Sequence, residues 1–155
     1  MEKIIGIGEY TITNGAEDRI KTFALASCIA VTAYSPSRRV AGMIHIALPS
    51  PTGSDSVLKP AYYAITGIPL LINKLCNEYG CLKGELKIQM FGGANSISDH
   101  DMFHIGKRNI ETVANVLSGM NLCIYNAEVG GKVSRTIEFD VATGNVNIFT
   151  QPISI

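Results

Sequence analysis

The sequence lacks an excess of charge of either sign, because its 13 basic side chains are balanced by 13 acidic ones. A protein that mainly binds nucleic acid usually carries a clear basic excess, so this balance argues against nucleic acid as the partner. The sequence also has no apolar run near the ~18–20 residues that span a bilayer. Its first residues contain no cleavage-site pattern. We therefore expect a cytoplasmic protein that does not insert into a membrane.

The sequence has no C-x-x-C pair, no internal repeat and no low-complexity tract. A chain of 155 residues in a reducing compartment needs no disulfide frame, so a reactive thiol would stay available. The hydrophobic fraction of 46% is enough for a buried core, and the length predicts a single domain over residues 1–155. Of the four cysteines, Cys76 falls on an apolar helical face, and we expect Cys81 and Cys123 to be unreactive.

Hydrophobic periodicity predicts an α/β chain with mixed strand pairing and two main helices. We expect strands over residues 4–12, 20–24, 29–34, 40–48, 86–91, 122–126, 136–141 and 146–150. We expect helices over 61–79 and 105–117, the first kinked by Pro69, and a loop over 50–59.

Cys28 and His45 stand at the two ends of a predicted hairpin whose turn is centred on Pro36 and Ser37. Residues equidistant from the centre of such a turn lie opposite each other in an antiparallel pair. Cys28 and His45 would then share one face of the sheet, with Cβ atoms roughly 4.5–5.5 Å apart. The shared face requires a loop of two or four residues, because a shift of one residue turns His45 to the other side.

A thiol beside an imidazole suggests nucleophilic catalysis. The imidazole can take the thiol proton, and the thiolate can attack an amide carbonyl. Backbone N–H groups at the small-residue bend around Ser27 could hold the resulting oxyanion. Thr22 on the preceding strand could supply the oxygen that orients His45. The competing interpretation is a buried cysteine that packs as a small hydrophobic residue.

Two further features give weaker signals. His100 and His104 are four residues apart, which on a helix places both imidazoles on one face and could bind zinc. No third ligand is evident, and the preceding residues favour a solvated loop or helix start. Arg108 and Asn109 begin a helical face, where Asn109 is a candidate for contact with substrate or an exposed polar residue.

Segments along nearly the whole chain form one ordered pattern, which comprises residues 5–10, Thr22 with 25–31, 42–49, 91–95, 105–109 and 130–139. In this combined pattern the sequence resembles the CheD family of chemoreceptor glutamine deamidases.

The resemblance implies an α/β sandwich like that of bacterial toxin deamidases. It implies a Cys–His–Thr site, with Cys28 as nucleophile, His45 as base and Thr22 as the orienting residue. The implied activity is that of a cysteine-dependent protein-glutamine glutaminase. It would hydrolyse glutamines in the cytoplasmic domains of chemoreceptors through a thioester, without a metal or an organic cofactor.

The resemblance also implies a CheC-type phosphatase as a partner. Ala26 departs from the family pattern, which has glycine before the Ser-Cys pair, and an alanine held at positive φ there would be strained. The alternative is therefore a non-catalytic chemotaxis module that binds and regulates CheC or receptors.

Overall fold

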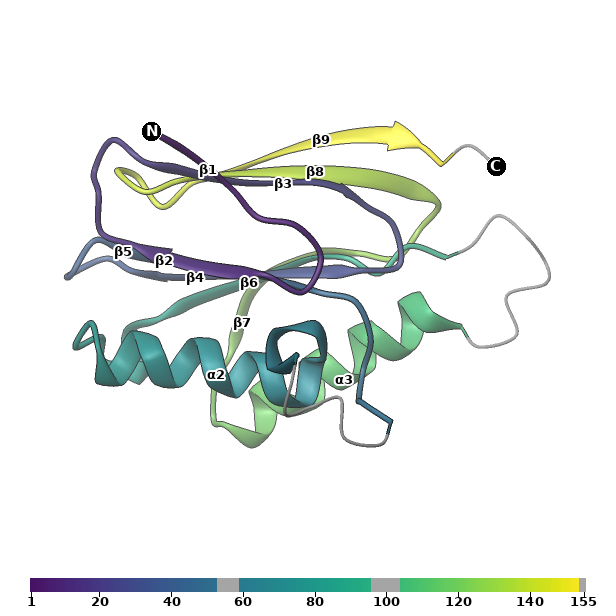
Figure 1. The fold of residues 1–155 in the computed structure, drawn as a ribbon, viewed down its shortest axis with the longest axis horizontal. Coiled ribbons are helices and arrows are strands. Elements are labelled where there is room, and N and C mark those ends of the chain that lie inside the picture. The colour runs from purple at the N-terminus through teal and green to yellow at the C-terminus, as the bar shows by residue number, and fades with distance from the viewer. Residues whose placement is uncertain (53–58, 96–103, 154–155) are drawn as a thin grey trace.

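The computed structural model describes residues 1–52, 59–95 and 104–153. The described chain forms three layers, which are an outer β-sheet, a central β-sheet and a pair of helices (Figure 1). This is the α/β architecture with two mixed sheets and two main helices that the sequence predicts. The loop expected over 50–59 lies mostly outside the described residues.

The outer sheet contains strands from both ends of the chain, in the order β1-β3-β8-β9. β1 pairs with β3 in parallel, and the other pairs are antiparallel. Its strands are β1 (Glu2–Ile4), β3 (Arg19–Leu25), β8 (Val133–Asp140) and β9 (Val146–Pro152).

The central sheet has the order β2-β5-β4-β6-β7, and only its β6–β7 pair is parallel. Its strands are β2 (Tyr10–Thr13), β4 (Ile29–Ser35), β5 (Val40–Ile46), β6 (Lys87–Gly92) and β7 (Ile124–Val129). Every residue of β4 and β5 is buried, because the outer sheet covers one face of these strands and the helices cover the other.

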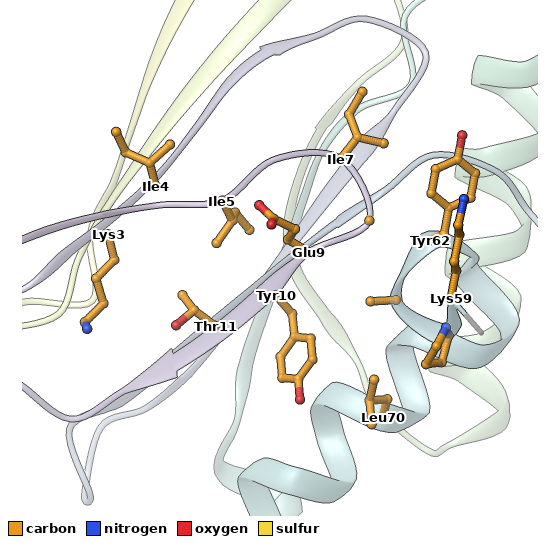
Figure 2. Close-up of a pocket in the computed structure, with 13 residues that line it drawn as sticks. Lys3, Ile4, Ile5, Ile7, Glu9, Tyr10, Thr11, Lys59, Tyr62 and Leu70 are labelled. Atoms are coloured by element: carbon orange, nitrogen blue, oxygen red, sulfur yellow. The ribbon is translucent and has the colours of Figure 1, made fainter. Parts of the chain in front are cut away.

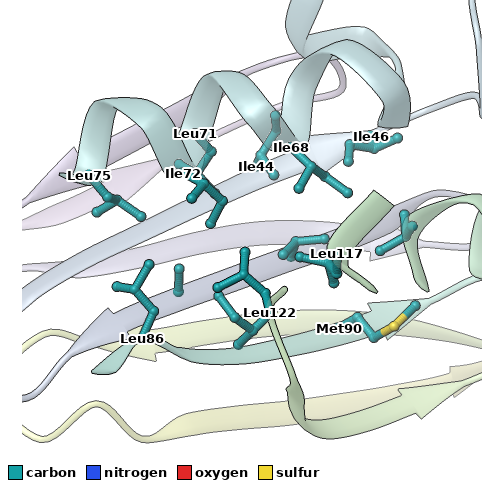
Figure 3. Close-up of a cluster of buried hydrophobic side chains, with 14 of the residues drawn as sticks. Ile44, Ile46, Ile68, Leu71, Ile72, Leu75, Leu86, Met90, Leu117 and Leu122 are labelled. Atoms are coloured by element: carbon teal, nitrogen blue, oxygen red, sulfur yellow. The ribbon is translucent and has the colours of Figure 1, made fainter. Parts of the chain in front are cut away.

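The helices α2 (Ala64–Asn77) and α3 (Ile105–Gly119) cover the central sheet, and short 3₁₀ turns η1 (Pro60–Tyr62) and η2 (Lys83–Glu85) flank α2. Pro69 lies inside α2. Apolar side chains of α2, α3 and the central sheet form the helix-facing layer, shown in Figure 3. Within the described part of the chain, no helix is long and apolar enough to cross a membrane.

The predicted opening strand over 4–12 is wrong. It is two strands, β1 and β2, that belong to different sheets and are joined by residues 5–9. Gly8 makes this connection possible, because its φ of +76° is rare for L side chains and a Cβ there would lie 2.9 Å from the Tyr62 ring. The segment therefore leaves one sheet and enters the other at this glycine.

Candidate active site

Residues of β4 and β5 alternate between the helix-facing layer and a second layer between the two sheets. The members of β4 and β5 in the inter-sheet layer are Ala30, Tyr34, Ala41 and Met43. His45 has the same parity as Ala41 and Met43, and Cys28 has the same parity as Ala30. Cys28 packs against the inter-sheet cluster, so both side chains lie on the face that the outer sheet covers.

The predicted direct opposition of Cys28 and His45 is wrong by two residues. His45 pairs with Ala30, and the last pair before the turn is Ser35 with Val40, so the loop has four residues instead of two. A shift of two residues leaves each side chain on the same face of the sheet. The prediction that Cys28 and His45 share one face is therefore correct. Cys28 stands one residue before β4 begins. Diagonal neighbours of this kind are usually about 7–8 Å apart between backbones.

Thr22 and His45 join the two sheets through their side chains. The Thr22 Oγ1 and His45 Nδ1 atoms are 2.7 Å apart, and both residues are buried. The Thr22 hydroxyl also donates to the Ile5 carbonyl oxygen at 2.8 Å. Thr22 comes from β3 and His45 from β5, so the predicted Thr–His contact is present in the structure.

These two hydrogen bonds determine the tautomer of His45. A hydroxyl has one proton, and that of Thr22 is donated to a carbonyl that can only accept. The Thr22 oxygen must therefore accept from His45, which places the ring proton on Nδ1 and leaves a lone pair on Nε2. The Nε2 atom is buried and has no hydrogen-bond partner among the described residues. The imidazole is thus oriented as a proton acceptor.

Burial keeps His45 neutral. Its side chain is buried between the sheets, which disfavours the imidazolium and lowers its pKa from 6.5 to about 4, while the charge of Glu9 has a smaller opposing effect. Burial also raises the pKa of the Cys28 thiol. In the resting protein the pair is therefore thiol and imidazole, and proton transfer must accompany the attack on a substrate.

The bend at residues 26–28, which we call the Cys28 bend, is held by its carbonyl oxygens. The Ala26 oxygen accepts from Ala94 N–H at 2.7 Å, and the Cys28 oxygen accepts from Gly93 N–H at 2.9 Å. The Ser27 oxygen accepts from the Asn109 side chain at 2.8 Å. Among the described residues, neither Ser27 N–H nor Cys28 N–H donates a hydrogen bond. Such unpaired donors are suited to an oxyanion.

Strain at Ala26, which the family comparison raised, is absent because Ala26 is not among the residues with positive φ. The positive φ occurs instead at Ala24, with a value of 53°, within the β-bulge between Thr22 and Leu25. Gly92 provides the close approach at the bend, because a Cβ there would overlap the Cys28 carbonyl oxygen. The alanine at position 26 therefore gives no structural reason for lost activity.

Asn109 is fully buried, so the expectation of an exposed polar residue is wrong. Its Nδ2 donates to Ser27 O and also to Ala47 O at 3.0 Å. Ser27 itself is half-buried in the Cys28 bend. The other thiols lie elsewhere. Cys76 packs against the helix-facing layer as predicted, and Cys81 is buried beyond the end of α2.

The sequence reasoning missed Arg135, a buried residue at the edge of the site. Its Nη1 donates to Gly92 O at 3.3 Å and its Nη2 to Gly130 O at 2.9 Å, while the buried Nε has no partner within the described ranges. The alternation of β8 contains the signal, because position 135 has the parity of the buried residues Ile137 and Phe139. Arg135 thus joins residues 92–95, which we call the Gly92 loop, to the turn at residues 130–131.

The proposed zinc pair cannot be assembled from the described residues. His100 lies outside them, and His104 is an exposed residue directly before α3. The described ranges contain no group of three or more side chains suited to hold a metal ion.

A cleft of about 890 Å³ lies between residues 3–11 and the segment around η1 (Figure 2). Gly8 N–H donates to His45 O, and His45 N–H donates to Glu9 O, so residues 8 and 9 separate the cleft from β5. Lys3, Lys59 and Tyr62 are among its lining residues. Cys28 does not line this cleft.

Known proteins resemble this chain in sequence along most of its length. A protein from Syntrophotalea carbinolica named "Probable chemoreceptor glutamine deamidase CheD" is 40% identical over 149 residues, covering 94% of this chain and 91% of that protein. A "Chemoreceptor glutamine deamidase CheD" from Halalkalibacterium halodurans is 40% identical over 135 residues, covering 84% of this chain and 83% of the relative.

The fold resembles a solved structure titled "Crystal structure of Bacillus licheniformis hypothetical protein YfiH". The TM-score is 0.50 at 13% identity, over 78% of this chain and 49% of that chain. The likeness concerns the fold alone. A family model described as "CheD chemotactic sensory transduction" matches residues 47–150. Because that model covers more than half of the chain and the relatives cover most of it, the chain belongs to the CheD family.

Proposed function

We propose that this protein hydrolyses selected glutamine side chains in the cytoplasmic domains of chemoreceptors to glutamate, with Cys28 as nucleophile and His45 as base. It would act as a cysteine-dependent protein-glutamine glutaminase, an amidohydrolase for linear amides. The names of the relatives support the substrate class. The observation that carries the chemistry is His45 Nε2, which no described residue bonds, with Nδ1 held by Thr22, on the same inter-sheet face as Cys28.

The first half of the reaction forms a thioester. His45 Nε2 takes the thiol proton as Cys28 Sγ attacks the carbonyl carbon of the glutamine side chain. The tetrahedral intermediate places negative charge on the former amide oxygen, which the unpaired N–H groups of the Cys28 bend would stabilise. His45 then gives its proton to the amide nitrogen, the C–N bond breaks, and ammonia leaves.

The second half uses water and regenerates the thiol. His45 takes a proton from a water molecule that attacks the thioester carbonyl, and the C–S bond breaks with the proton returned to sulfur. The products are a glutamate side chain and free enzyme. The reaction is balanced by one water molecule and requires no metal or organic cofactor.

A receptor signalling-domain fragment incubated with the protein tests the proposal by mass spectrometry. Conversion of glutamine to glutamate increases the mass by about one dalton, and Cys28→Ala should reduce the rate by at least about a thousandfold. Cys76→Ala is the matched control, since Cys76 packs against the helix-facing layer and should leave the rate unchanged. Full conversion by the Cys28→Ala variant would refute the assignment of the nucleophile.

A binding module is the second candidate, and the observation that favours it is the neutral resting state of Cys28 and His45, which leaves the thiol a weak nucleophile. A protein that binds the receptor fragment and converts none of its glutamines would support this role. Family membership also suggests a CheC-type phosphatase as a partner, which co-purification with such a phosphatase would test.

A further inference from the structure

We infer that Asn109 is a positioning residue that aims the Cys28 N–H at the reacting carbonyl oxygen of the substrate. The inference rests on the proposed function, because it assigns a role in the reaction of Cys28. The side chain of Asn109 is fully buried, yet it bonds no residue of its own helix. Both of its known hydrogen bonds go to backbone carbonyls beside the Cys28 site.

The amide of Asn109 replaces a missing strand pair. The β4–β5 ladder ends at Ile29 with Ile46. The next pair in that register would be Cys28 with Ala47, but Cys28 lies outside the strand. Asn109 Nδ2 instead donates to Ser27 O at 2.8 Å and to Ala47 O at 3.0 Å. One side chain therefore ties the Cys28 bend to the end of the strand that carries His45.

The direction of the Cys28 N–H follows from the planarity of the peptide. In a trans peptide the C=O of one residue and the N–H of the next point in opposite directions, and the described chain contains no cis peptide. The Ser27 C=O points at Asn109, which belongs to the helix layer. The Cys28 N–H therefore points away from the Asn109 amide, and it has no acceptor among the described residues.

The start of α3 is fixed closely enough to support this role. Gly106 packs directly on the Gly92 loop, because a Cβ there would overlap the Ala94 carbonyl oxygen. The same loop donates to the Ala26 and Cys28 carbonyls. The three consecutive carbonyls of the Cys28 bend are thus held by one loop and one helical side chain. Asn109 controls the middle one, whose peptide includes the Cys28 N–H.

The experiment compares Asn109→Leu with the parent protein in two reactions of Cys28. Deamidation passes through an oxyanion, whereas alkylation of the thiol by iodoacetamide does not. For folded protein, kcat of deamidation should fall about 100-fold with KM within about threefold, since loss of one oxyanion donor typically costs 10²–10³ in kcat. The alkylation rate should stay within about threefold. Asn126→Leu is the matched control, because Asn126 Nδ2 bonds Gln89 at an exposed site.

Asn109→Asp preserves the shape and donates at most one hydrogen bond, so it provides the same test if the leucine variant folds poorly. Its kcat should fall at least about tenfold under the same conditions. A kcat within threefold of the parent, or an alkylation rate that falls in parallel with kcat, would overturn the inference. If the Cys28→Ala variant kept the activity of the parent, the proposed function itself would be refuted. Failure of the inference and failure of the proposed function are therefore distinguishable.

Discussion

The two layers on either side of β4 and β5 are equally buried and differ in chemistry. The helix-facing layer consists mainly of apolar side chains such as Ile44, Leu71 and Leu117, although α3 also buries the amide of Asn109. The inter-sheet layer includes apolar residues too, but it also buries Thr22, His45 and Arg135 at 5% exposure or less. The same two strands thus present an apolar face to the helices and, to the outer sheet, a face that also carries buried polar groups.

This difference separates the residues that mainly stabilise the fold from those that are proposed to take part in the reaction. The buried Nε2 of His45 and Nε of Arg135 lack hydrogen-bond partners in the described part of the chain, and an unsatisfied buried polar atom typically costs ~1–3 kcal/mol. A layer that keeps such atoms is less stable than an apolar one of the same size. The helix-facing layer supplies the stability that offsets this cost, so substitutions in the two layers should affect different properties.

The largest effect is expected from Thr22→Val in the inter-sheet layer. Valine has the same shape and cannot accept from His45 Nδ1, so the ring loses the contact that leaves Nε2 unprotonated. We expect kcat of deamidation to fall about a thousandfold, roughly 4 kcal/mol of transition-state stabilisation. Steady-state kinetics on the receptor fragment measures this, and Thr22→Ser should recover most of the rate.

Thr32→Val is the matched control for that substitution. Thr32 is also buried, and its Oγ1 has no partner among the described residues. Removing an unsatisfied hydroxyl is neutral or stabilising, so activity and stability should be retained. Equal losses of activity in the two variants would show that the Thr22 effect is only structural.

Leu71→Ala should affect stability alone. Leu71 on α2 is fully buried against the central sheet. Its Cδ1 would lie 3.1 Å from a Cβ atom added at Gly42. Its truncation should lower the free energy of unfolding by about 3 kcal/mol, as measured in urea. The exposed Ile65 of the same helix provides the control, and Ile65→Ala should cost much less. A large fall in kcat per folded Leu71→Ala molecule would contradict the division between the layers.

Lowering the pH should weaken the inter-sheet layer. The pKa of His45 is about 4 in the folded protein against 6.5 ordinarily, so between these values the unfolded chain binds a proton that the folded protein excludes. Stability from this residue is therefore complete above about pH 6.5 and falls as the pH drops toward 4. From about pH 7 to pH 5 the expected loss is about 2 kcal/mol.

Urea unfolding at both pH values measures this loss, and His45→Gln isolates it. All other titrating groups are shared by the two proteins, so the difference between their pH dependences reports His45. The variant should lose about 2 kcal/mol less than the parent over the same range. Identical slopes would mean that the folded protein accommodates the imidazolium.

The sequence predicted most strands and both helices because their periodicity is strong. β4 and β5 begin where expected, and α3 begins at Ile105 as expected. Cys28 and His45 were placed on one face by the parity of the hairpin, which survived an error of two residues in the loop length. Parity is robust to such an error because side chains repeat every second residue.

The features that the sequence did not predict depend on contacts between residues far apart in the sequence. Gly8 is a local sign of a break near residues 5–9, but nothing local indicates which sheet each side of the break joins, or that Asn109 reaches the carbonyls of Ser27 and Ala47. An asparagine early in a helix usually faces water, and only the packing of α3 on the Gly92 loop buries this one. Arg135 was overlooked because charged residues are rarely inside.

The hydrogen bond from Thr22 to the Ile5 carbonyl has a consequence for shortened versions of the protein. That carbonyl belongs to the amino-terminal segment, which β1 anchors alongside β3. Without the Ile5 carbonyl, the Thr22 hydroxyl would be free to donate toward His45 Nδ1. That would favour the opposite tautomer and leave Nε2 protonated. Trimming the first few residues should therefore disable the proposed base while every member of the Cys–His–Thr set remained in the chain.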